Sequence, residues 1–113
     1  GPGTGPGTDP GTSPGAKPDS PGWDDYLQGR WLWQQRKPAT LAEATTHFRS
    51  AIEKDPQLAI AYVGLCDVFH FQHLYGDWPL SKVLAQCEPL RFDAWAAAQR
   101  DSAWQRVALR EGT

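Results

Sequence analysis

The sequence contains no methionine, only two cysteines and no long apolar run. Because natural chains begin at methionine, we expect a processed chain or a piece of a longer protein. Two cysteines are too few for a disulfide scaffold. No run approaches the roughly 18 to 20 apolar residues that a membrane-spanning helix needs, and no signal peptide pattern opens the chain. We therefore expect no membrane segment in this chain.

An excess of charge of either sign is also missing. The formal net charge is −2, and acidic and basic side chains are interspersed. Such a balance creates no long-range field toward phosphates or anionic lipids. We therefore expect that this segment contacts no nucleic acid.

Recognisable catalytic and cofactor motifs are absent as well. The chain has no glycine-flanked serine elbow, no paired carboxylate motif and no histidine in a triad-like context. The glycines match neither GxGxxG nor GxxxxGK[ST]. We expect no enzyme activity and no cofactor. The acidic residues near predicted helix ends are interpreted as solvated or helix N-terminal charges: Asp24, Asp25, Glu53 and Asp55.

Residues 1–22 hold seven of the eleven glycines and six of the ten prolines. They repeat with a period of four, as PGTG, PGTD, PGTS and PGAK, which excludes the three-residue collagen repeat. Such a segment buries too little apolar surface to offset its ordering entropy. We predict a disordered Pro/Gly-rich linker over residues 1–22 and one helical domain over residues 23–113.

Helical periodicity begins directly after this linker. A first helix is predicted over residues 25–36 and ends before Pro38. The second helix is predicted to begin at a capping box of Thr40 and Glu43, in which each side chain satisfies a free backbone amide.

A corner at Asp55 and Pro56 is predicted to separate the second helix from the third. Asp55 would cap the third helix, and Pro56 would occupy its first position, where an N–H is not needed. The third helix is predicted to end near Tyr75. Pro89 is predicted to end or kink the fourth helix, and a fifth covers about 92–110. The predicted fold is all-α, with about two antiparallel helix pairs and a C-terminal helix.

Gly29 lies on the packing face of the first predicted helix, between Tyr26 and Trp33. Glycine inside a helix costs about 1 kcal/mol relative to alanine. Its position on this face therefore indicates close approach of a neighbouring helix.

The run Ala44-x3-Phe48-x2-Ala51-x4-Pro56 resembles the second half of a tetratricopeptide repeat. In the same frame, the next repeat's packing positions hold Tyr62, Leu65, Cys66 and Phe69. The resemblance implies antiparallel helix pairs in which small residues allow close approach and aromatic residues fill the spaces between pairs.

Over about residues 26–84 the chain resembles a bacterial subgroup of these repeats. Its opening Y-x2-GR-x2-W pattern matches Tyr26, Gly29, Arg30 and Trp33, and its A-x-AY-x-GL pattern starts at Ala59. The subgroup is similar to modules of bacterial winged-helix transcription regulators, adenylate cyclases and serine/threonine kinases. The resemblance therefore implies a non-catalytic protein-interaction module, serving as the sensory or scaffolding part of a larger bacterial signalling or transcription regulator.

In such repeats the first helix of each pair lines a groove that binds a partner. By resemblance, the groove residues here are Ile60, Val63, Asp67, His70 and Phe71. The partner would be a protein or peptide in extended or helical form. The alternative is that these residues pack against a further repeat. Because stable arrays need about three repeats, we expect either a homodimer formed through exposed aromatic residues or a truncated parent.

The cysteines and histidines of the third and fourth helices leave two alternatives open. Cys66, His70, His73 and Asp77 have a spacing compatible with a metal site, but we favour a packed cysteine and two surface histidines. Cys66 and Cys87 lie about equally far from the predicted corner, so a disulfide is geometrically feasible, the alternative being two small apolar residues at a helix crossing. A metal- or redox-responsive switch using Cys66, His70, His73 and Cys87 is the rival function.

Overall fold

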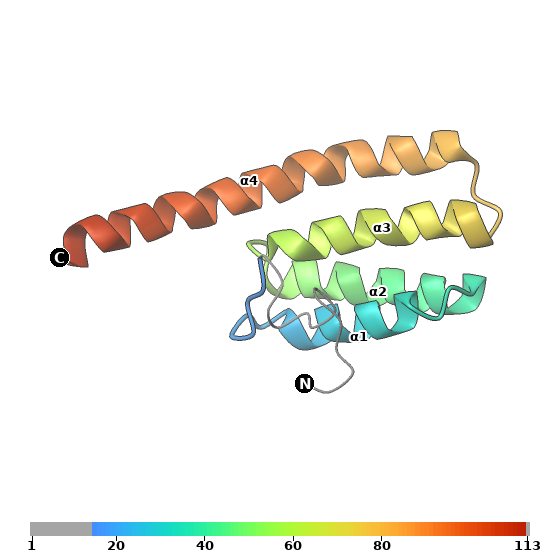
Figure 1. Cartoon of the computed structure of the whole chain (residues 1–113), viewed down its shortest axis with the longest axis horizontal. Coiled ribbons are helices and arrows are strands. Elements are labelled where there is room, and N and C mark those ends of the chain that lie inside the picture. Colours follow the sequence, from blue (N-terminus) through green and yellow to red (C-terminus); the bar gives the residue numbers. More distant parts are fainter. Residues whose placement is uncertain (1–14, 113) are drawn as a thin grey trace, which may run out of the picture.

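The computed structural model describes the backbone of residues 15–112 and the side chains of residues 15–101. In this part of the chain the elements are α1 (Trp23–Trp33), α2 (Pro38–Lys54), α3 (Ala59–Tyr75) and α4 (Leu80–Gly112). Each helix runs antiparallel to the next, and α3 lies between α2 and α4 (Figure 1). The described residues contain no strand, which confirms the all-α prediction. None of their helices combines the length and apolar character required to cross a membrane.

Phe48 of α2 lies at the centre of the junction between α1, α2 and α3. Gly29 of α1 and Gly64 of α3 both face its ring. A Cβ atom added to either glycine would lie 2.9 or 2.8 Å from Phe48 Cε1, closer than Cβ atoms are found in proteins. The close helix approach predicted at Gly29 is therefore present. The other buried apolar side chains of these three helices and their connections are Trp23, Tyr26, Leu32, Leu41, Ala44, Ala51, Leu58, Ala61, Tyr62, Leu65, Cys66, Val68 and Phe69.

A disulfide between Cys66 and Cys87 fastens α3 to α4, with the two Cα atoms 5.2 Å apart. Val83 of α4 is fully buried in the same layer. In the connection between the two helices, Trp78 stacks on Phe69 with ring centroids 4.9 Å apart. The α3–α4 hairpin is thus held covalently in its middle and by aromatic packing at its corner.

The start of α2 differs from the prediction. The helix begins at Pro38, and Thr40 is its third residue, so the capping box of Thr40 and Glu43 is wrong. The Thr40 hydroxyl oxygen instead accepts the backbone N–H of Lys37 at 3.3 Å. The physical reason is that proline suits the first helical position, which places the N-cap at Lys37, three residues before the predicted N-cap Thr40.

The bounds of α1 also differ, because the helix covers Trp23–Trp33 rather than 25–36. Its C-cap is Gln34, and the chain tightens there, because the N–H groups of Gln35 and Arg36 bond to carbonyls three residues earlier at 3.2 and 3.1 Å. Arg36 then has a left-handed φ of 55°, which prevents the helix from continuing toward Pro38.

The Asp55–Pro56 corner separates α2 from α3 as predicted, but α3 begins at Ala59 rather than at Pro56. Asp55 Oδ1 accepts the backbone N–H of Gln57 at 3.0 Å, and the Asp55 carbonyl accepts the N–H of Leu58 at 3.0 Å. Because these bonds hold the corner residues in a turn, the residues cannot also form the first turn of α3, which therefore begins later.

The predicted division of the C-terminal region at Pro89 is wrong. Helix α4 continues through Pro89 to Gly112, so the separate helix over 92–110 does not exist. A proline within a helix removes the hydrogen bond to the carbonyl four residues earlier. Here that carbonyl belongs to Ala85, and both residues are exposed, so water can hydrate it.

Residues 15–22, the last part of the predicted linker, contact the helical part of the chain. Ala16 packs against the apolar core, and the Ser20 hydroxyl donates a hydrogen bond to Asp55. Lys17 Nζ lies 2.8 Å from Asp101 Oδ1 of α4. The rest of the predicted linker, residues 1–14, lies outside the described residues.

Candidate functional site

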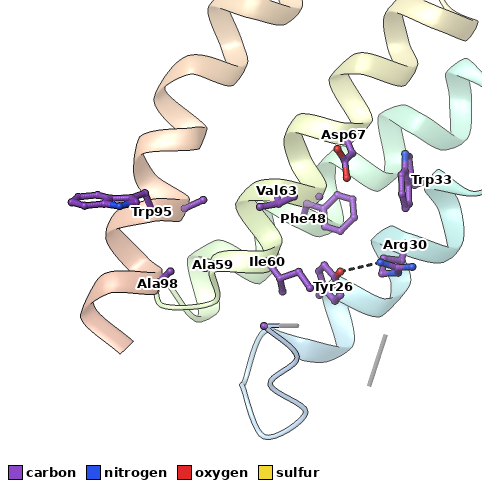
Figure 2. Close-up of a pocket in the computed structure, with 13 residues that line it drawn as sticks. Tyr26, Arg30, Trp33, Phe48, Ala59, Ile60, Val63, Asp67, Trp95 and Ala98 are labelled. Atoms are coloured by element: carbon purple, nitrogen blue, oxygen red, sulfur yellow. Dashed lines mark hydrogen bonds between the residues drawn. The ribbon is translucent and has the colours of Figure 1, made fainter. Parts of the chain in front are cut away.

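A groove of about 480 Å³ runs across one face of the hairpin array and is lined by residues of α1, α3 and α4. Its α1 side is formed by Tyr26, Arg30 and Trp33, which recur at helical spacing and therefore share one face. Figure 2 shows these side chains opposite those from α3, whereas the ring of Trp95 on α4 points away from them. The α3 and α4 residues that line the groove are Ala59, Ile60, Val63, Gly64, Asp67, Ala94, Trp95 and Ala98, with Phe48 from α2 beneath them.

Two hydrogen-bond donors in the groove wall have no partner within the described part of the chain. They are Arg30 Nε and Trp33 Nε1, and both atoms are buried. The Arg30 guanidinium lies 5.6 Å from the centroid of the Trp33 ring, and its Nη1 donates to the Tyr26 hydroxyl at 3.2 Å. Leaving a buried donor unpaired costs about 1 to 3 kcal/mol, so a ligand acceptor that reaches these atoms would gain from pairing with them.

Asp67 adds a carboxylate to the same groove from α3. Burial raises the pKa of Asp67 above its ordinary value, although His70 and Arg30 act in the opposite direction. Burial likewise raises the pKa of the Tyr26 hydroxyl. The groove therefore presents donors and an acceptor above an apolar floor.

The five predicted groove residues separate into three groups. Ile60, Val63 and Asp67 line the groove together. His70 lies one turn further along α3, in a smaller pocket of about 220 Å³ that also touches Val63 and Asp67. Phe71 turns to another side of α3, where its ring packs 5.2 Å from that of Trp33 and 5.3 Å from the Arg36 guanidinium.

From the sequence, Tyr26 and Trp33 were predicted to pack between helices, and Arg30 was not predicted to line the groove. Tyr26 is buried and Trp33 is partly buried, yet both line the groove as well. The helical spacing of Tyr26, Arg30 and Trp33 was the sequence signal that could have placed all three in the groove. No sequence signal could have placed Ala94 and Ala98 there, because their position depends on how α4 packs on α3.

The cysteines and one histidine form a second cluster at the contact between α3 and α4. His70 Nδ1 lies 3.7 Å from Cys66 Sγ and 3.9 Å from Cys87 Sγ. The same nitrogen lies 3.0 Å from the Cys66 carbonyl oxygen, one helical turn earlier. Of the two alternatives for the cysteines, the structure contains the bonded pair.

The fold does not bring together the four residues whose spacing was weighed as a metal site, namely Cys66, His70, His73 and Asp77. His73 Nδ1 lies 2.9 Å from the carbonyl oxygen of Trp78 and is directed to the corner. Among the described residues, the ligand atoms that lie within 4.8 Å of one another belong to Cys66, His70 and Cys87. Neither His73 nor Asp77 joins them, because the third residue comes from α4.

Asp25 forms an ionic contact between α1 and α2 that sequence reasoning did not foresee. Its carboxylate lies 3.0 Å from His47 Nδ1, accepts the Ser50 hydroxyl at 3.1 Å and contacts Lys54 Nζ at 2.6 Å. The serine hydroxyl is paired with the carboxylate rather than with the imidazole, so the group lacks the serine–histidine pair of a hydrolase. The arrangement ties two helices together.

Comparison with known proteins gives no match: no protein-family model fits the chain, and no curated protein or solved structure is significantly similar to it. Its function is therefore argued from the groove and from the cysteine–histidine cluster.

Proposed function

We propose that this chain is a non-catalytic protein-interaction module that binds a peptide segment of a partner in the groove across α1, α3 and α4. The observation that supports the proposal is the pair of unpaired donors, Arg30 Nε and Trp33 Nε1, in the wall of an apolar groove. Binding sites of this type combine an apolar surface with a few polar groups that fix orientation.

The chemistry of the groove selects a peptide rather than a purely apolar ligand. Ile60 and Val63 offer apolar contact, and Val63 is half exposed before any ligand binds. The unpaired nitrogens of Arg30 and Trp33 are buried, so a peptide carbonyl would accept from them once the side chain turns toward the groove. A peptide amide can donate to Asp67, whose carboxylate is desolvated and gains from such a bond.

The resemblance to tetratricopeptide repeats supports the same proposal. In those repeats the first helix of each pair lines the ligand groove. If α1–α2 and α3–α4 are taken as the pairs that the resemblance implies, the first helices are α1 and α3, and residues of both line the groove. By this resemblance the module is the sensory or scaffolding part of a larger bacterial signalling or transcription regulator. The partner recognised in the groove would then be a protein segment that controls or positions the regulator.

Selection of a phage-displayed random peptide library against the folded chain tests this proposal. The groove variant is Val63→Glu and its matched control is Leu84→Glu, because each native side chain is 50 % exposed and Leu84 lies on α4 away from the groove. Selected peptides should bind the wild type and Leu84→Glu equally. They should bind Val63→Glu at least about tenfold more weakly, a loss of about 1.4 kcal/mol.

Two results would overturn the proposal. One is failure of the library to yield any peptide that binds the folded chain. The other is equal binding of the selected peptides to Val63→Glu and to the wild type, with circular dichroism showing that both are folded.

A further inference from the structure

The cysteine–histidine cluster places three ligand atoms from two helices around one point. Cys66 and His70 come from α3, Cys87 comes from α4, and the three ligand atoms lie within 4.8 Å of one another. Cys87 is 1 % exposed and Cys66 is 9 % exposed, so the sulfurs are shielded from water. The side chain of His70 is less buried and borders the pocket of about 220 Å³.

We propose that the reduced form of this cluster binds a thiophilic divalent cation such as zinc through Cys66, Cys87 and His70. Zinc binds cysteine sulfur at about 2.3 Å and histidine nitrogen at about 2.0 to 2.1 Å. Tetrahedral angles then place sulfur and nitrogen ligands about 3.6 Å from each other. The observed distances from His70 Nδ1, 3.7 and 3.9 Å, are close to this value on both sides.

Two steps lead from the disulfide to the metal complex. A dithiol reductant attacks the Cys66–Cys87 bond, is itself oxidised to a disulfide, and leaves two electrons and two protons on the cysteine sulfurs. The divalent cation then displaces both thiol protons and accepts a lone pair from each sulfur and from His70 Nδ1. That nitrogen gives up its present contact with the Cys66 carbonyl.

The charge balance favours the complex in this location. Two thiolates neutralise a divalent cation, so the product buries no net charge. The pocket beside the cluster leaves room for water as a fourth ligand, because it borders Cys66 and His70 and is also lined by the exposed Arg91. The α3–α4 contact would thus be held either by a disulfide or by a metal ion, depending on the redox state.

Cobalt titration of the phosphine-reduced full chain, under anaerobic conditions, tests the inference. A thiolate-to-cobalt charge-transfer band should appear with a stoichiometry of one ion per chain, and zinc should abolish it. The oxidised chain should give no band. Cys87→Ser should lose it, and His70→Ala should weaken cobalt binding at least about tenfold, as expected for the loss of one ligand.

His73→Ala is the matched control, since this histidine lies on the same helix but outside the cluster. It should bind cobalt as the wild type does. The inference is overturned if the reduced wild type gives no charge-transfer band, or if His70→Ala binds as tightly as His73→Ala. If reduction removes the helical circular dichroism signal, recovery of that signal on adding zinc supports the site, and absence of recovery contradicts it.

Discussion

The ring of Phe48 lies so close to the backbone of Gly64 that a Cβ atom on Gly64 would approach Phe48 Cε1 to 2.8 Å. Gly29 faces the same ring from α1 at almost the same distance. One aromatic side chain of α2 therefore sets how closely α1 and α3 approach, and these are the helices that carry most of the groove residues.

Substitution Gly64→Ala should destabilise the protein by about 1 to 3 kcal/mol, because the added methyl group forces Phe48 to move in a packed core. This loss should exceed the gain of about 1 kcal/mol in helix propensity. Urea unfolding followed by circular dichroism measures the difference. In the double variant Phe48→Leu/Gly64→Ala, the second change should cost less than it does alone.

The control for this prediction is Gln28→Ala, at an exposed position of α1, which should change the free energy of unfolding by less than about 0.5 kcal/mol. An increase in stability of Gly64→Ala would show that the space beside Phe48 is open, contrary to the close approach described here.

The Cys66–Cys87 disulfide should contribute about 2 to 4 kcal/mol to stability, because it closes a loop with a sequence separation of 21 residues. Urea unfolding of the wild type with and without a phosphine, in the presence of a chelator, measures this contribution. The double variant Cys66→Ser/Cys87→Ser is the control and should not respond to the phosphine. Equal unfolding midpoints of the reduced and oxidised wild type would contradict the prediction.

The ionic contact of Asp25 should make stability depend on acid pH. The pKa of Asp25 is lowered from 3.8 to about 2, chiefly by the hydrogen bond from Lys54 and then by that from His47. Since the folded-state pKa is depressed, the stabilisation is present above about pH 4 and is lost as the pH falls toward 2. Because Lys54 is largely exposed, we expect a contribution of only about 1 kcal/mol.

Comparison of Asp25→Asn with the wild type at pH 5 and at pH 2 measures this effect by urea unfolding. The difference in the free energy of unfolding should be fully present at pH 5 and much smaller at pH 2, where the folded-state carboxyl is about half protonated. The exposed neighbour provides the control Asp24→Asn, which should not show this pattern. A difference of equal size at both pH values would mean that the stabilisation by Asp25 does not depend on the charge of its carboxylate.

Phe92 and Trp95 form an exposed aromatic pair on α4, with ring centroids 6.1 Å apart and exposed fractions of 65 % and 60 %. Large exposed apolar side chains favour association, so the homodimer, one of the two alternatives expected from the sequence beside a truncated parent, would form through this surface. Sedimentation equilibrium should show a dimer for the wild type and a monomer for Phe92→Glu/Trp95→Glu. A wild type that remains monomeric at all concentrations would contradict this expectation.

The sequence predicted the parts of the fold that depend on local patterns. The glycine at position 29 indicated close packing. Of the five α3 residues that the resemblance to tetratricopeptide repeats implied for the groove, Ile60, Val63 and Asp67 line it. Helix limits at Thr40, Pro56 and Pro89 were wrong, because turn geometry at the helix ends and solvation of a freed carbonyl decided them. The spacing of apolar residues does not predict which of two local structures of nearly equal free energy, a helical turn or another turn, forms at a helix end.

The remaining part of the candidate sites depends on how α4 packs against α3. The sequence left the pairing of Cys66 with Cys87 open as geometrically feasible. The position of His70 within 4 Å of both sulfurs was not predicted, because it depends on the rotation of α4 about its own axis. The same rotation brings Ala94 and Ala98 to the groove.

The most direct test of the proposed function is the indole N–H resonance of Trp33 in a two-dimensional proton–nitrogen spectrum, recorded while a library-selected peptide is added. Trp33 Nε1 has no hydrogen-bond partner among the residues that the structure describes, so the account predicts a large shift of this resonance, with little change at the Leu84 amide on α4. Saturated peptide binding that shifts Leu84 and leaves the Trp33 indole unchanged would contradict it.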